Sequence, residues 1–291
     1  MKKWGFTTGL ILLLLVVAIF KLIERQETFG ERSNPAEDGI VRTIAPIKKG
    51  EHLEITEERL NRGDLLLVNR DYPVRPQGVK SDVVDLFGQP ELTGGASLLD
   101  GGIRLSREVA LKFAAMTAAA GEDGVDHFLI SSGYRDEAEQ SALYAEKGAE
   151  YALPAGYSEH NLGLSLDIGS TEGKMSEAAE GRWLERNSAR YGFVLRYPAD
   201  KTEITGIGFE PWHFRYVGLP HSAIMRTNNL VLEEYLDMLD EDPDISTTVG
   251  GRDYEIHYYA PDRLSKLSVP ANRDYSLSGD NRGGVIVTVY L

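Results

Sequence analysis

Two short stretches in the middle of the chain alternate apolar and polar side chains, which predicts strands with one face toward a core. In residues 164–169, LSLDIG, the apolar side chains share one face and Asp167 lies on the other. Residues 213–217, HFRYV, alternate in the same way, with His213 on one face. Pro211 precedes this second strand and cannot donate to a sheet ladder, so it is typical of an edge or a bulge.

The other patterns mix helices and strands without regular alternation or repeats. Helix-forming stretches predict helices over residues 106–121, 136–150, 176–192 and 228–239. Ser106 is the expected N-cap of the first, and Asp136 and Glu139 have the spacing of a capping box. Apolar runs predict strands within residues 64–74, 127–135, 193–198, 254–260 and 283–291, the last two as a hairpin or small added sheet. We expect an α+β fold with a mainly antiparallel sheet flanked by helices.

The N-terminus carries a separate signal. Two lysines are followed by residues 4–20, which contain no charge, and two more apolar residues follow Lys21. A membrane-spanning helix needs about 20 apolar residues. We predict an uncleaved single-pass anchor over residues 1–23, because no small-x-small cleavage site follows the run, with a cleaved signal peptide as the alternative. The N-terminal lysines stay inside, so the rest of the chain faces outward.

The rest of the chain divides into three segments. Residues 24–60 are polar and predict a stalk. Residues 61–245 contain most of the predicted helices and strands and are expected to form the main domain. Residues 246–291 form a C-terminal β extension of unassigned role. A chain of 291 residues is long enough to bury a full core, and we expect a monomer.

Composition and motifs exclude several functions. The net charge of −14 disfavours nucleic acid as a partner, because such binding needs basic patches. The absence of cysteine excludes disulfides, thiolate metal sites and cysteine nucleophiles. The chain contains no Ser-x-x-Lys, Gly-x-Ser-x-Gly, His-Glu-x-x-His or nucleotide-binding glycine motif.

Two places combine metal-capable side chains with turn residues. One holds His160 and Asp167, which meet only if the chain bends at residues 161–163 before the strand begins. The other holds Glu210 and His213, which a bulge at Pro211 would bring to one side. Two histidines and a carboxylate form a three-ligand site in which zinc keeps a fourth position for water. The same spacing also fits hydrogen-bonded histidines and a solvated glutamate, so both interpretations stay open at this point.

These motifs carry a resemblance to a known family. The segments SEHNLGLSLDIG and EPWHFRYVG resemble the two metal-site motifs of the VanY-type D-alanyl-D-alanine carboxypeptidases, which are zinc peptidases grouped with D,D-dipeptidases and the hedgehog fold. SSGYR with Gln140, YGFVLRYP and LEEYL are also similar, so the resemblance covers residues 65–240. Ser165 departs from it, because the family usually has alanine there. The implied fold is a hedgehog/D-Ala-D-Ala peptidase-like domain after the transmembrane helix.

The resemblance also implies a role for each motif residue. It makes His160, Asp167 and His213 the ligands of one Zn²⁺ ion and Glu210 the general base. Arg135 would polarise the scissile carbonyl oxygen, with pairing to the terminal carboxylate of the substrate as the alternative. The implied substrate-binding residues are Ser158, Gln140 and Trp212, with Tyr134 and Tyr197 as further pocket walls.

The expected function is removal of the terminal D-alanine from peptidoglycan stem pentapeptides or their lipid-linked precursor, outside the membrane. An L,D-carboxypeptidase acting on tetrapeptide stems is the nearest alternative, because the same motifs serve it. A non-catalytic wall-binding module is the alternative from another class, although such a module has no need of the base Glu210. A dipeptidase acting on free D-Ala-D-Ala is disfavoured by the outward orientation. The link to glycopeptide resistance stays open.

Overall fold

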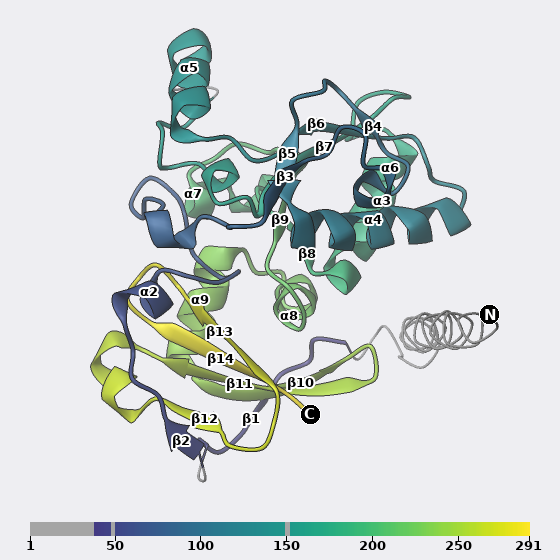
Figure 1. The fold of residues 1–291 in the computed structure, drawn as a ribbon. Helices are drawn as coiled ribbons and strands as arrows, with labels where there is room; N and C mark the ends of the chain where they lie inside the picture. The colour runs from purple at the N-terminus through teal and green to yellow at the C-terminus, as the bar shows by residue number, and fades with distance from the viewer. Residues whose placement is uncertain (1–37, 48–49, 149–151) are drawn as a thin grey trace, which may run out of the picture.

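The computed structural model describes residues 38–47, 50–148 and 152–291, so the anchor predicted over residues 1–23 lies outside the described part. None of the helices in these ranges has the length and apolar character needed to cross a membrane. Two five-stranded sheets organise the chain, one in each half of the molecule (Figure 1).

Fourteen short strands and eight α-helices carry the described fold. The strands are β1 (Arg42–Thr43), β2 (Gly50–His52), β3 (Val83–Asp85), β4 (Ser97–Leu98), β5 (Arg104–Ser106), β6 (Phe128–Ser132), β7 (Ser165–Ser170), β8 (Phe193–Leu195), β9 (His213–Tyr216), β10 (Asp244–Val249), β11 (Arg252–Tyr259), β12 (Ser268–Pro270), β13 (Tyr275–Gly279) and β14 (Val285–Tyr290). The α-helices are α2 (Glu57–Leu60), α3 (Pro90–Thr93), α4 (Arg107–Glu122), α5 (Glu137–Lys147), α6 (Ala179–Asn187), α7 (Thr202–Thr205), α8 (His221–Thr227) and α9 (Leu232–Glu241). Short 3₁₀ turns include η2 (Glu159–Asn161) and η3 (Ser188–Tyr191).

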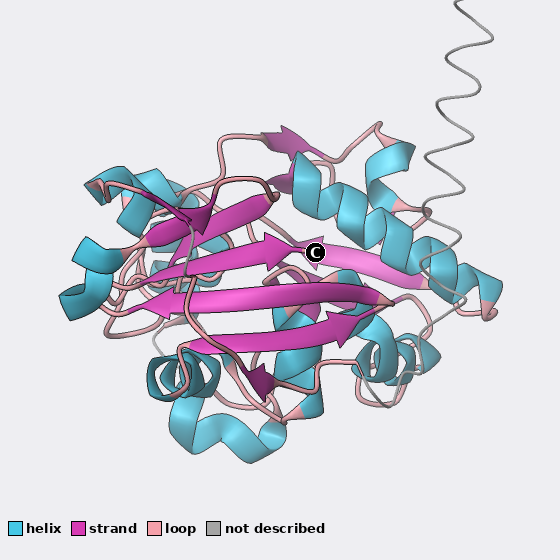
Figure 2. Cartoon of the chain, turned by 90° about the horizontal axis from the view of Figure 1, so that it is seen from below, coloured by secondary structure: helices cyan, strands magenta, loops and turns pink. Residues whose placement is uncertain are grey.

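The sheets confirm the α+β class with antiparallel pairing. One sheet has the order β4-β6-β7-β9-β8 and the other the order β1-β10-β11-β14-β13. Among the described strand pairs, β4 with β6 is parallel and the others are antiparallel. Figure 2 shows the second sheet from below. We call the first the catalytic sheet and the second the C-terminal sheet.

Local sequence signals explain where the longer helices begin. Ser106 caps α4 by accepting a hydrogen bond from the backbone of Val109. Asp136 and Glu139 form the predicted capping box of α5. Helix α6 begins at Ala179, three residues later than the pattern predicts, because residues 174–178 form hydrogen-bonded turns.

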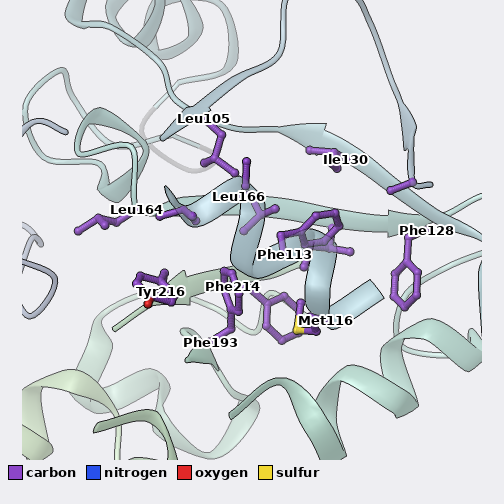
Figure 3. Packing of buried hydrophobic residues seen from close by; sticks show 14 of the residues in the cluster. Leu105, Phe113, Met116, Phe128, Ile130, Leu164, Leu166, Phe193, Phe214 and Tyr216 are labelled. Atoms are coloured by element: carbon purple, nitrogen blue, oxygen red, sulfur yellow. The ribbon is translucent and has the colours of Figure 1, made fainter. Parts of the chain in front are cut away.

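The catalytic sheet buries one face against α4 and α6. The apolar side chains of β7 and β9, such as Leu166 and Phe214, pack against Phe113 and Met116 of α4 (Figure 3). Trp183 of α6 lies in the same cluster. Fully burying side chains of this size contributes about 1.5–3 kcal/mol each. This core holds β7 and β9 in place, so the opposite face of these strands can carry polar residues.

Helices α8 and α9 lie between the two sheets (Figure 1). Leu232 and Leu236 of α9 pack in one cluster with Ile256 of the C-terminal sheet and Val194 of the catalytic sheet. The boundary predicted between residues 245 and 246 therefore crosses a continuous apolar core.

Part of the predicted stalk, residues 24–60, pairs with the C-terminal half. Strand β1 pairs with β10, and β2 pairs with β12. Leu53 and Leu60 pack against a buried cluster that includes Val287 of β14. The C-terminal runs 254–260 and 283–291 form neighbouring antiparallel strands, β11 and β14, within one sheet.

The strand predicted at the start of residues 64–74 is wrong. Leu65 and Leu67 are buried, but their N–H groups donate to the Ser278 hydroxyl and the Asp280 carbonyl and pair with no strand. Arg215 donates to the carbonyls of Asp64 and Leu66, and Asn281 donates to the carbonyl of Leu67. An apolar run signals burial alone, and here distant side chains take the place of a neighbouring strand.

We predict that His221 makes the free energy of unfolding fall as the pH falls. It is buried between Tyr235 of α9, at 2.7 Å, and Thr288 of β14, at 2.9 Å. Burial lowers its pKa to about 3, whereas an unfolded histidine titrates near ~6.5. Between these values the unfolded state binds the extra proton, so the free energy of unfolding falls as the pH falls. The contribution is about 2 kcal/mol between pH 7 and pH 5.

Urea unfolding of wild type and His221→Gln at the two pH values measures this. The variant is expected to be less stable at pH 7 and to lose about 2 kcal/mol less on acidification. His127→Gln is the control, because His127 is exposed. Equal losses in wild type and His221→Gln would contradict the prediction.

Candidate active site

Asp167 and His213 lie opposite each other on neighbouring strands. Antiparallel pairing of β7 with β9 places Asp167 directly across from His213, with Ser165 across from Arg215. All four side chains lie on the face away from the α4 core, because Leu166 and Phe214 occupy the core side. The His213 Nδ1 and Asp167 Oδ1 atoms are 3.1 Å apart.

The bend before β7 returns His160 to the same face. Turn η2 contains His160, and Gly163 follows with a φ of +82°, a conformation that side-chain-bearing residues rarely adopt. The His160 Nε2 atom is 3.4 Å from Asp167 Oδ1. The two imidazole rings meet edge to face, with centroids 4.9 Å apart.

The carbonyl of Gly133 fixes the His160 ring from behind, 2.6 Å from Nδ1. If Nδ1 carries the proton, Nε2 is left as the ligand atom. A Cβ on Gly133 would lie 2.1 Å from the carbonyl oxygen of Arg104, so the close approach of the chain after β6 to β5 requires glycine here. An irregularity in the pairing of β6 with β7, between Ile130 and Ser132, redirects the chain just before this carbonyl.

The three side chains fit a metal ion. His160, Asp167 and His213 each offer a ligand atom, and these atoms lie within 4.8 Å of one another. Asp167 Oδ1 is buried, yet it makes no hydrogen bond to any described residue, although both ring nitrogens are close. Two nitrogens and one carboxylate oxygen that surround a common point without bonding one another are the donor set that zinc uses.

Burial and charge shift the pKa of each of these groups. Burial alone would raise the pKa of Asp167, but His160 and His213 lower it well below its ordinary value. Burial lowers the pKa of His160. Burial also acts to lower the pKa of His213, but the close carboxylates of Asp167 and Glu159 outweigh it and raise that pKa to about 9.

Glu210 reaches the site from a turn. The backbone N–H of His213 donates to the carbonyl of Glu210 at 3.2 Å, which closes a four-residue turn through Pro211. The predicted bulge is therefore wrong, although the turn also brings Glu210 to the ligand side. Its Oε2 is 3.8 Å from His213 Nδ1. Burial raises the pKa of Glu210, which brings this carboxylate closer to the range of a general base.

Arg135 lies beside the carboxylates of the site. Its backbone N–H donates to the carbonyl of His160, and its Nη1 donates to Ser132 at 3.3 Å. Burial lowers its pKa, and Asp167 and Glu210 partly offset that effect. The buried Nε atom has no hydrogen-bond partner within the described residues, so one donor of this guanidinium is available to a ligand.

The three predicted substrate-binding residues differ in their surroundings. Ser158 caps η2 by accepting from the backbone of His160, which is a structural contact. Gln140 is buried on α5 and donates to the carbonyl of Leu153, while its Oε1 bonds no described residue. Trp212 is 42% exposed beside His213, as a pocket wall would be.

Sequence reasoning missed the role of Glu159. It precedes His160 but turns away from Asp167, and its carboxylate is buried against Arg196 and Arg215. Burial alone would raise the pKa of Glu159, but the two guanidinium groups lower it well below its ordinary value. The available signal was the position of Arg215 on the same strand face as His213, where a buried cation requires an anion.

The chain is similar in sequence to known peptidases. Residues 102–219 match the family model described as VanY: D-alanyl-D-alanine carboxypeptidase. A D-alanyl-D-alanine carboxypeptidase of Enterococcus faecium is 58% identical over 236 residues, which cover 81% of this chain and 78% of that protein. The bifunctional D-Ala-D-Ala dipeptidase and carboxypeptidase VanXYC of Enterococcus gallinarum is 35% identical, covering 60% of this chain and 94% of that protein.

Solved structures agree with these relationships. The vancomycin resistance D,D-dipeptidase VanXYg, in complex with a D-Ala-D-Ala phosphinate analogue, is 31% identical with a TM-score of 0.69, covering 87% of this chain and 100% of that one. A mutant of the D,D-pentapeptidase VanY from a VanB-type resistance cassette, in complex with Zn(II), is 36% identical with a TM-score of 0.50, covering 60% and 98%. The chain therefore belongs to the VanY family of D-alanyl-D-alanine carboxypeptidases.

Proposed function

We propose that the protein is a zinc D,D-carboxypeptidase that removes the terminal D-alanine from peptidoglycan stem pentapeptides outside the membrane. The observation that carries this proposal is the convergence of His160, Asp167 and His213 on one point, with Glu210 beside them. The Zn(II) complex of the related D,D-pentapeptidase VanY supports the choice of metal.

His160 Nε2, His213 Nδ1 and Asp167 would hold a single ion. When bound, zinc supplies Lewis-acid polarisation of the scissile carbonyl and lowers the pKa of water toward ~7. The protein's part is to keep the imidazole rings oriented, as the carbonyl of Gly133 does behind His160.

Glu210 is the general base in this proposal. Its carboxylate takes a proton from the water that attacks the scissile carbonyl carbon. When the C–N bond breaks, the same carboxyl group gives that proton to the departing amine of D-alanine. Arg135 stabilises the negative charge that develops on the carbonyl oxygen, using its Nη groups or its Nε, which has no partner among the described residues.

Of the remaining predicted residues, Gln140 and Trp212 contact the substrate in this proposal. Gln140 Oε1, which bonds no residue in the described part of the chain, is the acceptor for a backbone N–H of the stem peptide. Trp212 walls the pocket, and Ser158 contributes by holding η2 in its capped form. The partner is a stem peptide, either in the wall or on its lipid-linked precursor.

Location follows from the apolar run of residues 4–20 between flanking lysines. We place the chain in the membrane as a single-pass protein with its catalytic domain outside. Stem peptides within the wall lie outside the membrane, so a wall substrate is reached from this orientation.

We predict that Glu210→Gln lowers kcat by about 10²–10⁴-fold, because the amide cannot accept the proton. Zinc content is expected to stay at the wild-type level, since the three ligands are unchanged. Steady-state release of D-alanine from a pentapeptide, together with metal analysis, measures both quantities. Glu203→Gln is the matched control, because Glu203 is exposed on α7. Full activity in Glu210→Gln would show that the assigned mechanism is wrong.

We predict that pentapeptide stems are shortened by one D-alanine and that tetrapeptide stems are left intact. Mass spectrometry of both digests measures this directly. A chelator is expected to abolish the reaction, and added Zn²⁺ to restore it. Cleavage of tetrapeptide alone would identify an L,D-carboxypeptidase, and metal binding without turnover of either peptide would identify a wall-binding module.

We predict that the full-length protein sediments with membranes and is degraded by protease added to cells stripped of their wall. A variant that lacks residues 1–23 is expected in the soluble cytoplasmic fraction, because it has lost the export signal. Recovery of the full-length protein in that fraction would contradict the proposed location.

A further inference from the structure

The carboxylate of Glu159 lies behind His213, on the side opposite to Asp167. Its Oε2 is 3.4 Å from His213 Nε2, while Asp167 Oδ1 is 3.1 Å from His213 Nδ1. Ser165 donates to the same Oε2 at 3.1 Å. The His213 ring is therefore held between two carboxylates, only one of which faces the ligand side.

Two arginines hold this carboxylate in place. Glu159 Oε1 accepts from Arg196 Nε at 2.8 Å and from Arg215 Nη1 at 2.7 Å. Glu159, Arg196 and Arg215 are each at most 1% exposed. Hydrogen bonds between charged groups have a defined geometry in such surroundings, because bulk water does not compete for the buried donors.

Each arginine is itself anchored outside the strands that carry the ligands. Arg196 makes a bidentate pair with Glu233 of α9, with N–O distances of 2.7 and 2.9 Å. Arg215 donates to the carbonyls of Asp64 and Leu66, each at 2.9 Å. Two carboxylates and two guanidinium groups balance in charge, so the cluster can stay buried.

We propose that Glu159 is a positioning residue of the metal site: its carboxylate accepts a hydrogen bond from the Nε2–H of His213 and thereby directs Nδ1 to the metal. This inference rests on the proposed zinc site and adds a residue that contacts neither the metal nor the substrate. It explains why the two histidines present different nitrogens. A carbonyl behind Nδ1 directs Nε2 of His160, and a carboxylate behind Nε2 directs Nδ1 of His213.

The test is the metal affinity of Glu159→Gln. Partners behind a ligating histidine typically change metal affinity or activity by about 10–100-fold. We expect a loss of zinc affinity in this range by chelator competition, a lowered kcat with KM nearly unchanged, and an altered absorption spectrum of the Co²⁺-substituted protein. Glu180→Gln is the matched control, because Glu180 is also buried but lies on α6 and accepts from the backbone of His127. It is expected to keep wild-type affinity and spectrum even where it loses stability.

Glu159→Asp decides the case if Glu159→Gln does not fold. It keeps the negative charge between the arginines but withdraws the carboxylate from His213. A folded Glu159→Asp protein with wild-type zinc affinity and Co²⁺ spectrum would overturn the proposal, as would a folded Glu159→Gln protein with the same properties. Wild-type protein that binds no zinc or releases no D-alanine would refute the proposed function itself. The wild-type measurement therefore separates the two failures.

Discussion

The buried charge cluster between the two sheets is the constraint on which the site and the fold both depend. Transfer of a charged group from water into a protein interior costs several kcal/mol, even after relaxation, unless the group is paired. Glu159, Arg196 and Arg215 are all buried, and Glu233 completes the balance from α9. The cluster satisfies its members only when the catalytic sheet, α9 and residues 64–66 are assembled together. Correct assembly of the two halves is thus tied to the position of the His213 ring.

Local patterns made the ligand-bearing elements predictable. The alternation around Asp167 and around His213 identifies two strands and the face that each side chain occupies, and antiparallel pairing makes the two residues neighbours. The glycine at position 163 indicates the turn that returns His160. The faces of the two strands and the turn at Gly163 could be predicted because they depend only on nearby residues. Over such short distances, backbone geometry alone determines which side chains share a face.

Interactions between distant segments were not predictable in the same way. Glu159 meets arginines that are 37 and 56 positions away, and no local pattern specifies such a pair. The run at Leu65 has the apolar pattern of a strand, but Arg215 donates hydrogen bonds to the carbonyl groups of Asp64 and Leu66. In a regular strand, Glu210 and His213 would lie on opposite faces. A bulge or a turn at Pro211 would bring them to one side, and the sequence does not distinguish the two.

The two sides of the ligand set differ in how completely their polar atoms are satisfied. On the side away from the metal position, the carbonyl of Gly133 pairs with Nδ1 of His160 and the carboxylate of Glu159 pairs with Nε2 of His213. In front, Asp167 Oδ1 and Arg135 Nε are buried without a hydrogen bond to any described residue. An unsatisfied buried group costs about 1–3 kcal/mol, a cost that a bound ligand removes when it supplies the missing partner. The rigid rear side therefore stabilises an arrangement in which the front side is left incomplete, as a site for metal and substrate requires.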